Sequence, residues 1–364
     1  MQRDFHYYAI ATLARAAGFD ADDALIIGYA SQYVDDSTES ELIQLDINGS
    51  DVKFDPVRST YDGLAIVDSI QWSAQKRVWI PFHFIPPKPF QPEASETFSF
   101  VTEPNSEFSR MLLEVAARAK HRKHRLCAIG IAMHTFADTW AHQRFSGRQD
   151  RYENDVETIQ VYKNKKYETL GIENALFDVL PQIGHAEAGF FADFAYIRWR
   201  YQAAGQKKMI TRNNLTEFME AAETIYKWFR NHTSNPPVLK WENELEPEFR
   251  KMLAGKPRKQ PRLKDRLTIP LHKAFQQQDL EERCDRWRIT FGELFKPVQH
   301  KYFYNQHERR NDAIIGETDW DKFSSRDWDR EGPFKVKTGF WDSLWVHFHR
   351  AALRQRHLVL ENLP

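Results

Sequence analysis

Three residues of metal-binding type lie four positions apart in the segment 126–142. His134, Asp138 and His142 interrupt a run that is otherwise mostly apolar. In a helix, each interval of four residues advances about 40° around the axis and about 6 Å along it, so the three side chains share one face. A helix that is apolar on every side is buried, and a buried carboxylate is costly unless it is paired or bound to a metal. The spacing therefore predicts a buried two-metal site, in which His134 and His142 each hold one ion and Asp138 bridges the two.

Further ligands must come from other parts of the chain, because three are too few for two ions. The candidates are His6, Asp35, Asp36, His83 and His185. Singly, each has an ordinary explanation as a helix-start, turn or strand residue. Together they form a His/Asp set without cysteine, which suits zinc or manganese in hydrolytic sites. The two cysteines of the chain, Cys127 and Cys284, cannot build a cysteine-based zinc cluster.

The pattern resembles the superfamily of zinc-dependent phospholipases C and fungal single-strand nucleases, whose signature is a helix with His-x3-Asp followed by another His. The matching segment is His134-Thr135-Phe136-Ala137-Asp138-Thr139-Trp140-Ala141-His142. The sequence also resembles an uncharacterised bacterial family with a His-Thr-x-Ala-Asp-Thr-Trp-Ala-His core. The resemblance covers residues 1 to about 205. It implies a largely helical core around a cluster of two or three Zn²⁺ ions, with Mn²⁺ as the other candidate.

The resemblance also implies roles for the remaining candidates. His6 matches an early His on the first helix of the superfamily, and Asp36 (or Asp35) with His83 matches an Asp that precedes a His. His185 matches the His of a later His-x3-Glu motif. Position 189 is glycine, so Glu187 or Asp193 would have to replace that Glu. The superfamily also binds metal through the amine and carbonyl of its processed N-terminus, whereas this sequence starts with Met1 and no leader is visible.

The reaction implied is hydrolysis of a phosphodiester or phosphomonoester, in which a metal-activated water attacks phosphorus in line. Asp138 would bridge the ions, Asp36 would be a ligand, and Asp35 would accept the proton. The substrate would carry either a phospholipid headgroup or a nucleic-acid backbone. The basic run 118–125 could attract either one, although a solvated helix end is its more ordinary explanation.

Two rival interpretations use the same residues differently. A phosphohydrolase of the HD type needs an adjacent His-Asp pair, and none occurs in this sequence. A non-catalytic helical interaction protein, with a structural or decayed metal site, would account for Gly189 and for the unprocessed start. Metal content and turnover of a model diester would separate these possibilities.

The composition is that of a folded chain. Among 364 residues, 41% are hydrophobic and the 51 basic residues balance the 51 acidic ones. These values exclude a disordered chain and a binder held mainly by bulk charge. No run of 18 apolar residues occurs, so we expect no transmembrane segment and a cytoplasmic protein. The oligomeric state is not determined by these features.

The elements that would position the ligands are expected to be mostly helices. The expected helices are 4–17, 21–33, 107–125, 126–143, 172–181, 186–201, 213–231, 279–294 and 340–360. Short β-branched runs at 40–47, 63–70 and 76–85 predict a small β insertion at about 41–86. We therefore expect a mainly α fold, with a phospholipase C/nuclease-like helical core over residues 1–235. A mostly helical extension would follow over residues 236–364.

Overall fold

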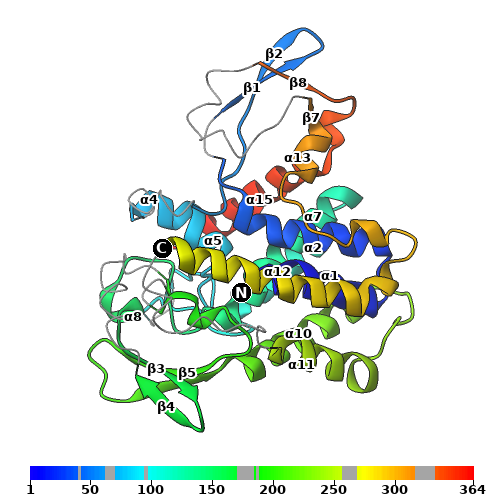
Figure 1. Cartoon of the computed structure of the whole chain (residues 1–364). Helices are drawn as coiled ribbons and strands as arrows, with labels where there is room; N and C mark the ends of the chain where they lie inside the picture. The colour runs from blue at the N-terminus through cyan, green and yellow to red at the C-terminus, as the bar shows by residue number, and fades with distance from the viewer. Residues whose placement is uncertain are drawn as a thin grey trace.

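The computed structural model describes residues 1–39, 42–61, 70–93, 97–169, 184–185, 188–255, 269–315 and 333–364. Its centre is a layer of helices (Figure 1). Helix α7 (Arg122–Ala141) is buried along most of its length and packs against α2 (Ala21–Asp36), α6 (Glu107–Ala117) and α15 (Leu344–Glu361). The chain starts with η1 (Asp4–Ala9) and α1 (Ile10–Ala17), which pack on α2.

Local sequence explains where several of these helices begin and end. Gly18 ends α1 in the left-handed conformation at φ 115°, which only glycine adopts at little cost. Ser106 caps α6 by accepting a hydrogen bond from the Ser109 amide, and Ser343 caps α15 through the Val346 amide. The expected helices at 4–17, 21–33, 126–143, 213–231 and 340–360 are confirmed, with their ends shifted by at most four residues. The helix expected at 279–294 is part of a longer one that begins at Ile269. The segment 107–125 is divided between α6 and α7.

The close approach of α2 and α7 depends on Gly130. A Cβ atom at this position would lie 2.4 Å from the backbone oxygen of Ile27 and 2.7 Å from the Cβ of Ala30. No other residue type allows two helix backbones to come so near. This contact sets the spacing between α2 and the face of α7 that carries His134.

The helical layer has a four-stranded sheet at each of two ends (Figure 1). One sheet has the order β2 (Ser50–Phe54), β1 (Ile43–Ile47), β8 (Phe334–Val336), β7 (Ile314–Ile315). The other has the order β4 (Lys166–Thr169), β3 (Val156–Lys163), β5 (Arg198–Ala203), β6 (Met209–Asn213) and is antiparallel. Its inner face packs Trp199 and Tyr201 against Phe84 and Phe145.

These two sheets make the chain a mixed α/β protein, so the expectation of a mainly α fold with one small β insertion is wrong. The expected helix at 186–201 is instead the short turn η3 (Gly189–Ala192) followed by strand β5. In β5, buried Trp199 and Tyr201 alternate with the less buried Arg198 and Arg200. This alternation has the period of two that is typical of a half-buried strand.

The β insertion at 41–86 is confirmed only in its first part. Strands β1 and β2 form a hairpin around Asn48 and Gly49, which have φ values of 56° and 80°, as a tight hairpin turn requires. The segment 76–85 is mostly helical instead, with α4 (Trp72–Ala74), η2 (Gln75–Trp79) and α5 (Ile80–Phe82). Packing against the core outweighs the β preference of its residues there. The expected elements at 63–69 and 172–181 lie outside the described residues.

The elements after residue 235 share a core with those before it. Further helices are α8 (Arg151–Asn154), α10 (Asn214–Asn231), η4 (Trp241–Leu245), α11 (Glu246–Ala254), α12 (Ile269–Phe291), η6 (Gly292–Phe295), η7 (Gln299–Lys301), α13 (Glu308–Ala313) and η9 (Phe340–Asp342). α12 packs on η1, α15 packs on α7, and β8 pairs in parallel with β1. One hydrophobic cluster runs from Met1 to Leu363.

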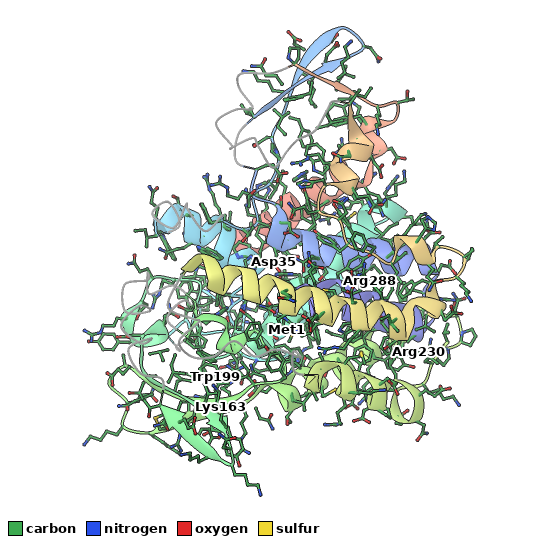
Figure 2. The ribbon with its side chains drawn as sticks, viewed as in Figure 1. Met1, Asp35, Lys163, Trp199, Arg230 and Arg288 are labelled. Carbon is green, nitrogen blue, oxygen red and sulfur yellow. The ribbon has the colours of Figure 1, made fainter. Side chains whose placement is uncertain are left out.

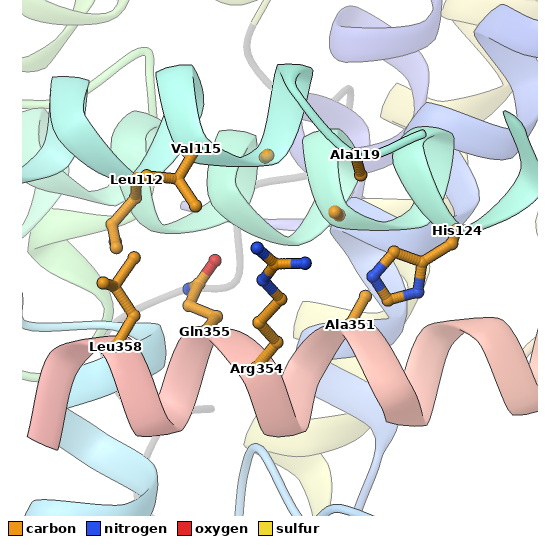
Figure 3. A pocket seen from close by; sticks show the side chains of 10 residues that line it. Leu112, Val115, Ala119, His124, Ala351, Arg354, Gln355 and Leu358 are labelled. Carbon is orange, nitrogen blue, oxygen red and sulfur yellow. The ribbon is translucent and has the colours of Figure 1, made fainter. Parts of the chain in front are cut away.

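A narrow cavity lies between α6, α7 and α15 (Figure 3). Apolar side chains such as Leu112, Val115 and Leu358 line it, together with His124 and Arg354. Its volume of about 20 Å³ is enough for one water molecule. Within the described part of the chain, no helix is both long enough and apolar enough to cross a membrane.

Candidate metal centre

Imidazole and carboxylate groups from distant segments meet against one face of α7. They comprise His6 from η1, Asp35 from α2, His83 after α5, His134 and Asp138 from α7, His142 at the end of α7, and His185 and Asp193 on either side of η3. The amine of Met1 lies in the same place. The ligand atoms form three groups, and within each group all lie within 4.8 Å of one another: His6–His134–Asp138, Asp35–His83–His134 and His142–His185–Asp193.

Asp138 lies at the centre and is 1% exposed. Its Oδ1 is 3.1 Å from His6 Nε2, and its Oδ2 is 3.2 Å from His134 Nε2 and 3.3 Å from His83 Nδ1. Asp35 Oδ1 lies 3.6 Å from His134 Nε2. With metal bonds of about 2.0–2.1 Å, two ligand atoms of a tetrahedral zinc site lie about 3.3 Å apart. The spacing between these side chains therefore fits ligands of a metal ion as well as direct hydrogen bonds and ion pairs.

The third group lies beyond the end of α7. Asp193 Oδ1 is 3.5 Å from His142 Nε2, and Asp193 Oδ2 is 3.6 Å from His185 Nε2. Phe84 stacks on the His142 ring at 4.6 Å and limits access from that side. His142 Nδ1 also lies 3.6 Å from Asp138 Oδ2, so this group adjoins the other two.

Backbone carbonyls determine which nitrogen of three imidazoles faces the cluster. His83 Nε2 donates to Ser59 O at 3.0 Å, His142 Nδ1 to His83 O at 2.9 Å, and His185 Nδ1 to Gly189 O at 2.9 Å. Because a carbonyl only accepts, each donating nitrogen carries the hydrogen and the other nitrogen presents a lone pair. This is the arrangement by which proteins orient metal-bound histidines.

Several buried polar atoms of the cluster have no hydrogen-bond partner among the described residues. They are Nδ1 of His6 and Nδ1 of His134, whereas His6 Nε2 and Asp193 Oδ1 have ion-pair contacts with Asp138 and with Met1. Buried polar groups are normally paired, because leaving one without a partner costs free energy. The chemistry of this donor set and its unpaired atoms fit a divalent cation of the zinc or manganese type.

Burial keeps three of the imidazoles, those of His6, His134 and His142, neutral. It lowers the pKa of His6 to about 3 and those of His134 and His142 to about 4. Burial also raises the pKa of Asp35 well above its usual range, and the charge of Asp138 adds to this effect. For Asp138, burial is outweighed by His142 and the Met1 ammonium, which hold its pKa well below the ordinary value. Near neutral pH these three His side chains therefore offer lone pairs, as metal binding requires.

Asp36 lies outside the cluster, which corrects its assignment as a ligand. Its Oδ2 accepts hydrogen bonds from Tyr304 Oη at 2.6 Å and Gln32 Nε2 at 3.1 Å. α2 extends to Asp36 instead of ending at residue 33, and adjacent helical residues point about 100° apart. Only one of the two aspartates can therefore face α7, and that one is Asp35. The other predicted metal-site residues, His6, His83, His134, Asp138, His142 and His185, come together as described above.

Asp193 is one of the two residues expected to replace the Glu that is missing at position 189, and it lies beside His142 and His185. It follows η3 in the chain. Burial of this carboxyl is outweighed by His185 and the Met1 ammonium, which lower its pKa. Glu187, the other expected replacement, lies outside the described residues.

The model of a family of unknown function, DUF6765, matches residues 1–363. This chain belongs to the DUF6765 family. The match includes α12 and α15 as well as every residue of the metal centre. Neither the curated proteins nor the solved structures searched contain a match to the chain.

The Met1 amine is a participant in this DUF6765 protein that the residue pattern did not predict. It donates to Asp138 Oδ1 at 2.7 Å and lies 3.2 Å from Asp193 Oδ1. Burial acts to lower the pKa of this amine, but the two carboxylates outweigh it and raise the pKa to about 11. The family resemblance was the one signal that pointed to an N-terminal amine.

A fourth group of ligand types, His121, Asp342 and His347, lies where α7 and α15 begin. His347 Nε2 is 3.0 Å from Asp342 Oδ1, and Lys123 Nζ donates to Asp342 Oδ2 at 2.6 Å. The Lys123 ammonium therefore already neutralises the carboxylate of this group. We interpret the contacts as an ion-pair link between the two helices.

Proposed function

We propose that this DUF6765 protein is a metal-dependent hydrolase of phosphoric esters, with two or three zinc or manganese ions as its resident metals. The observation that carries the proposal is the orientation of His83, His142 and His185, whose hydrogens go to backbone carbonyls and whose lone pairs point into one cluster. The motif shared with the zinc-dependent phospholipases C and single-strand nucleases supports the same class of reaction.

The three groups of side chains suggest which residues would hold the metals. One ion would bind to Asp35, His83 and His134, and a second to His142, His185 and Asp193. A third would bind to His6 and Asp138 next to the Met1 amine. Bound there, such metals would act as Lewis acids on the phosphoryl group and lower the pKa of a bound water.

Asp35 is the carboxylate best placed to meet a substrate. Its side chain is 30% exposed, compared with 1% for Asp138. Its Oδ1 lies near His134 and His83. A bound cation would favour the ionised form of Asp35, which burial and Asp138 disfavour, and the ionised carboxylate could then help to hold the metal and receive a proton from the attacking water. Asp138 is enclosed, so besides binding the third ion with His6 it would hold the imidazoles and the N-terminal amine around it.

Neighbouring Asp35 and Asp36 form a matched pair of variants. Asp35→Asn should lower hydrolysis of bis(p-nitrophenyl) phosphate by about 10²–10⁴-fold, because it removes a metal-facing carboxylate. Asp36→Asn should stay within a few-fold of the wild type, because Asp36 bonds to Tyr304 and Gln32 instead. Metal content by plasma mass spectrometry and initial rates would be measured for both variants after reconstitution with Zn²⁺ or Mn²⁺.

The result distinguishes the proposal from the non-catalytic alternative. Wild-type protein that retains no metal would end the hydrolase proposal. Retained metal without turnover of the model diester, phosphatidylcholine vesicles or single-stranded DNA would favour a structural site. A loss of activity in Asp36→Asn as large as that in Asp35→Asn would contradict the assignment of the two aspartates.

A further inference from the structure

Arg283 of α12 is a buried cation that binds the first residues of the chain. Its side chain is 3% exposed, and its guanidinium donates to Asp4 Oδ2 and to Gln2 Oε1. Its Nε also donates to Asp279 Oδ2 at 3.2 Å, one turn earlier on α12. In Figure 2, α12 crosses the view beside the labelled Met1, in agreement with its packing on η1.

The same guanidinium also contacts the segment that follows Asp193. It lies over the rings of Phe194 at 5.5 Å and Tyr196 at 6.0 Å. Tyr196 Oη in turn donates to Asp279 Oδ2 at 3.2 Å. One side chain of α12 therefore touches both the segment that carries Met1 and His6 and the segment that carries Asp193.

These two segments meet inside the metal centre. The Met1 amine lies between Asp138 and Asp193, at 2.7 Å and 3.2 Å, and His6 reaches Asp138 from the same end of η1. The distance between the start of the chain and residue 193 therefore affects two of the three ligand groups. In the contacts described above, Arg283 links the two segments from outside the cluster.

We propose that Arg283 is a positioning residue of the metal centre, which sets the spacing between the N-terminal segment and the Asp193 segment. This inference rests on the proposed metal site. It also gives α12, which lies beyond the region that resembles the phospholipase C superfamily, a specific part in that site. A lysine cannot fill the role, because its single ammonium lacks the planar fork that reaches Asp4 and Gln2 together.

The test compares Arg283→Lys with Arg288→Lys, which makes the same change on the same helix. Arg288 is labelled in Figure 2, is 31% exposed, lies over the ring of Phe303 and belongs to none of the ligand groups described above. Metal-free protein would be titrated with Zn²⁺ and with Co²⁺, following stoichiometry and the visible spectrum of Co²⁺. Circular dichroism in EDTA would report on the fold.

We expect Arg283→Lys to bind one ion at least about 10-fold more weakly and to change the Co²⁺ spectrum, with an unchanged metal-free fold. Arg288→Lys should titrate like the wild type. If Arg283→Lys does not fold, the Tyr196→Phe variant tests the inference instead. This substitution removes only the hydrogen bond to Asp279. We expect it to change the Co²⁺ spectrum in the same way as Arg283→Lys, but by a smaller amount. If these variants keep the stoichiometry, affinity and Co²⁺ spectrum of the wild type, the positioning role of Arg283 is contradicted, but the proposed metal site is not. A wild-type protein that binds neither ion would overturn the proposed function with it.

Discussion

The hydrogen on each imidazole is a residue-scale feature that controls what the cluster can bind. His83, His142 and His185 give that hydrogen to Ser59 O, His83 O and Gly189 O. These acceptors are backbone carbonyls, so the residue types at positions 59, 83 and 189 do not indicate that they orient an imidazole. The sequence therefore indicated which residues could be ligands, but it could not indicate their tautomers.

His349 provides a test of burial at the residue scale, away from the metal centre. Its ring is 2% exposed, its Nδ1 accepts from the Val57 amide at 3.0 Å, and burial lowers its pKa to about 3. Because the unfolded chain has a His pKa of about 6.5, the unfolded state binds more protons between pH 6.5 and 3. The contribution of His349 to the unfolding free energy therefore falls as the pH falls through this range.

His349→Asn keeps an acceptor for Val57 and removes this titration. Between pH 7 and pH 5, the zinc-free wild type should lose about 2 kcal/mol more unfolding free energy than the variant. The side chains of the metal centre are the same in both proteins, so their effect cancels in the comparison. Urea unfolding at the two pH values measures the difference. Equal losses in the two proteins would show that His349 is not buried as a neutral ring.

At the scale of elements, the end of α7 is stabilised by a strand of the second sheet. The last carbonyls of a helix lack partners within it, and Arg212 of β6 donates to Trp140 O at 2.8 Å and Ala141 O at 3.2 Å. Arg212 is itself buried and paired with Glu217. Strand β6 therefore helps to set the position of His142, the next residue after these carbonyls.

Arg212→Met should destabilise the protein by about 2–4 kcal/mol, because it leaves two carbonyls and Glu217 without their donor. It should also weaken the binding of one metal ion, through His142. Arg198→Met is the control, since Arg198 lies exposed on the opposite face of the same sheet and should change stability by about 1 kcal/mol or less. Urea unfolding and Zn²⁺ titration measure both effects. Similar losses in the two variants would argue against a capping role for Arg212.

At the scale of the whole molecule, the proposed metal centre can form only in the folded state. Its candidate ligands come from segments between Met1 and Asp193, and Arg283 contacts two of these segments from the C-terminal part. An ion that binds the folded chain alone adds stability of RT ln(1 + [L]/Kd). Metal removal should therefore destabilise the whole protein.

Saturation with Zn²⁺ at 100 times its dissociation constant should stabilise the wild type by about 2.7 kcal/mol per ion relative to EDTA-treated protein. The midpoint of thermal unfolding should then rise by several degrees. Asp138→Asn, which removes the central carboxylate, should show little of this rise. Scanning fluorimetry with and without EDTA measures both proteins, and a midpoint that does not respond to zinc in the wild type would contradict a metal centre of this affinity.

The features that could be predicted from the sequence are those encoded by residues close together in the chain. The helical spacing of His134, Asp138 and His142 identified the centre, and the Asn48-Gly49 turn identified the β1–β2 hairpin. The strand β5 was mistaken for a helix, because its alternating Trp199 and Tyr201 are recognisable only once one face of the sheet is known to be buried. The choice between Asp35 and Asp36 required the true end of α2, and helix ends are weakly encoded.

The sequence by itself determined the donor chemistry: a His/Asp set without cysteine, centred on one buried helical face. Tertiary structure decided which of those donors meet, that the Met1 amine joins them, and that Arg283 of a distant helix holds two of the contributing segments. The physical reason is the distance along the chain over which each kind of information acts. Periodicity and residue type act over a few positions of the chain, whereas lone pairs from residues 6 to 193 are brought within a few ångströms only by the packing of the core.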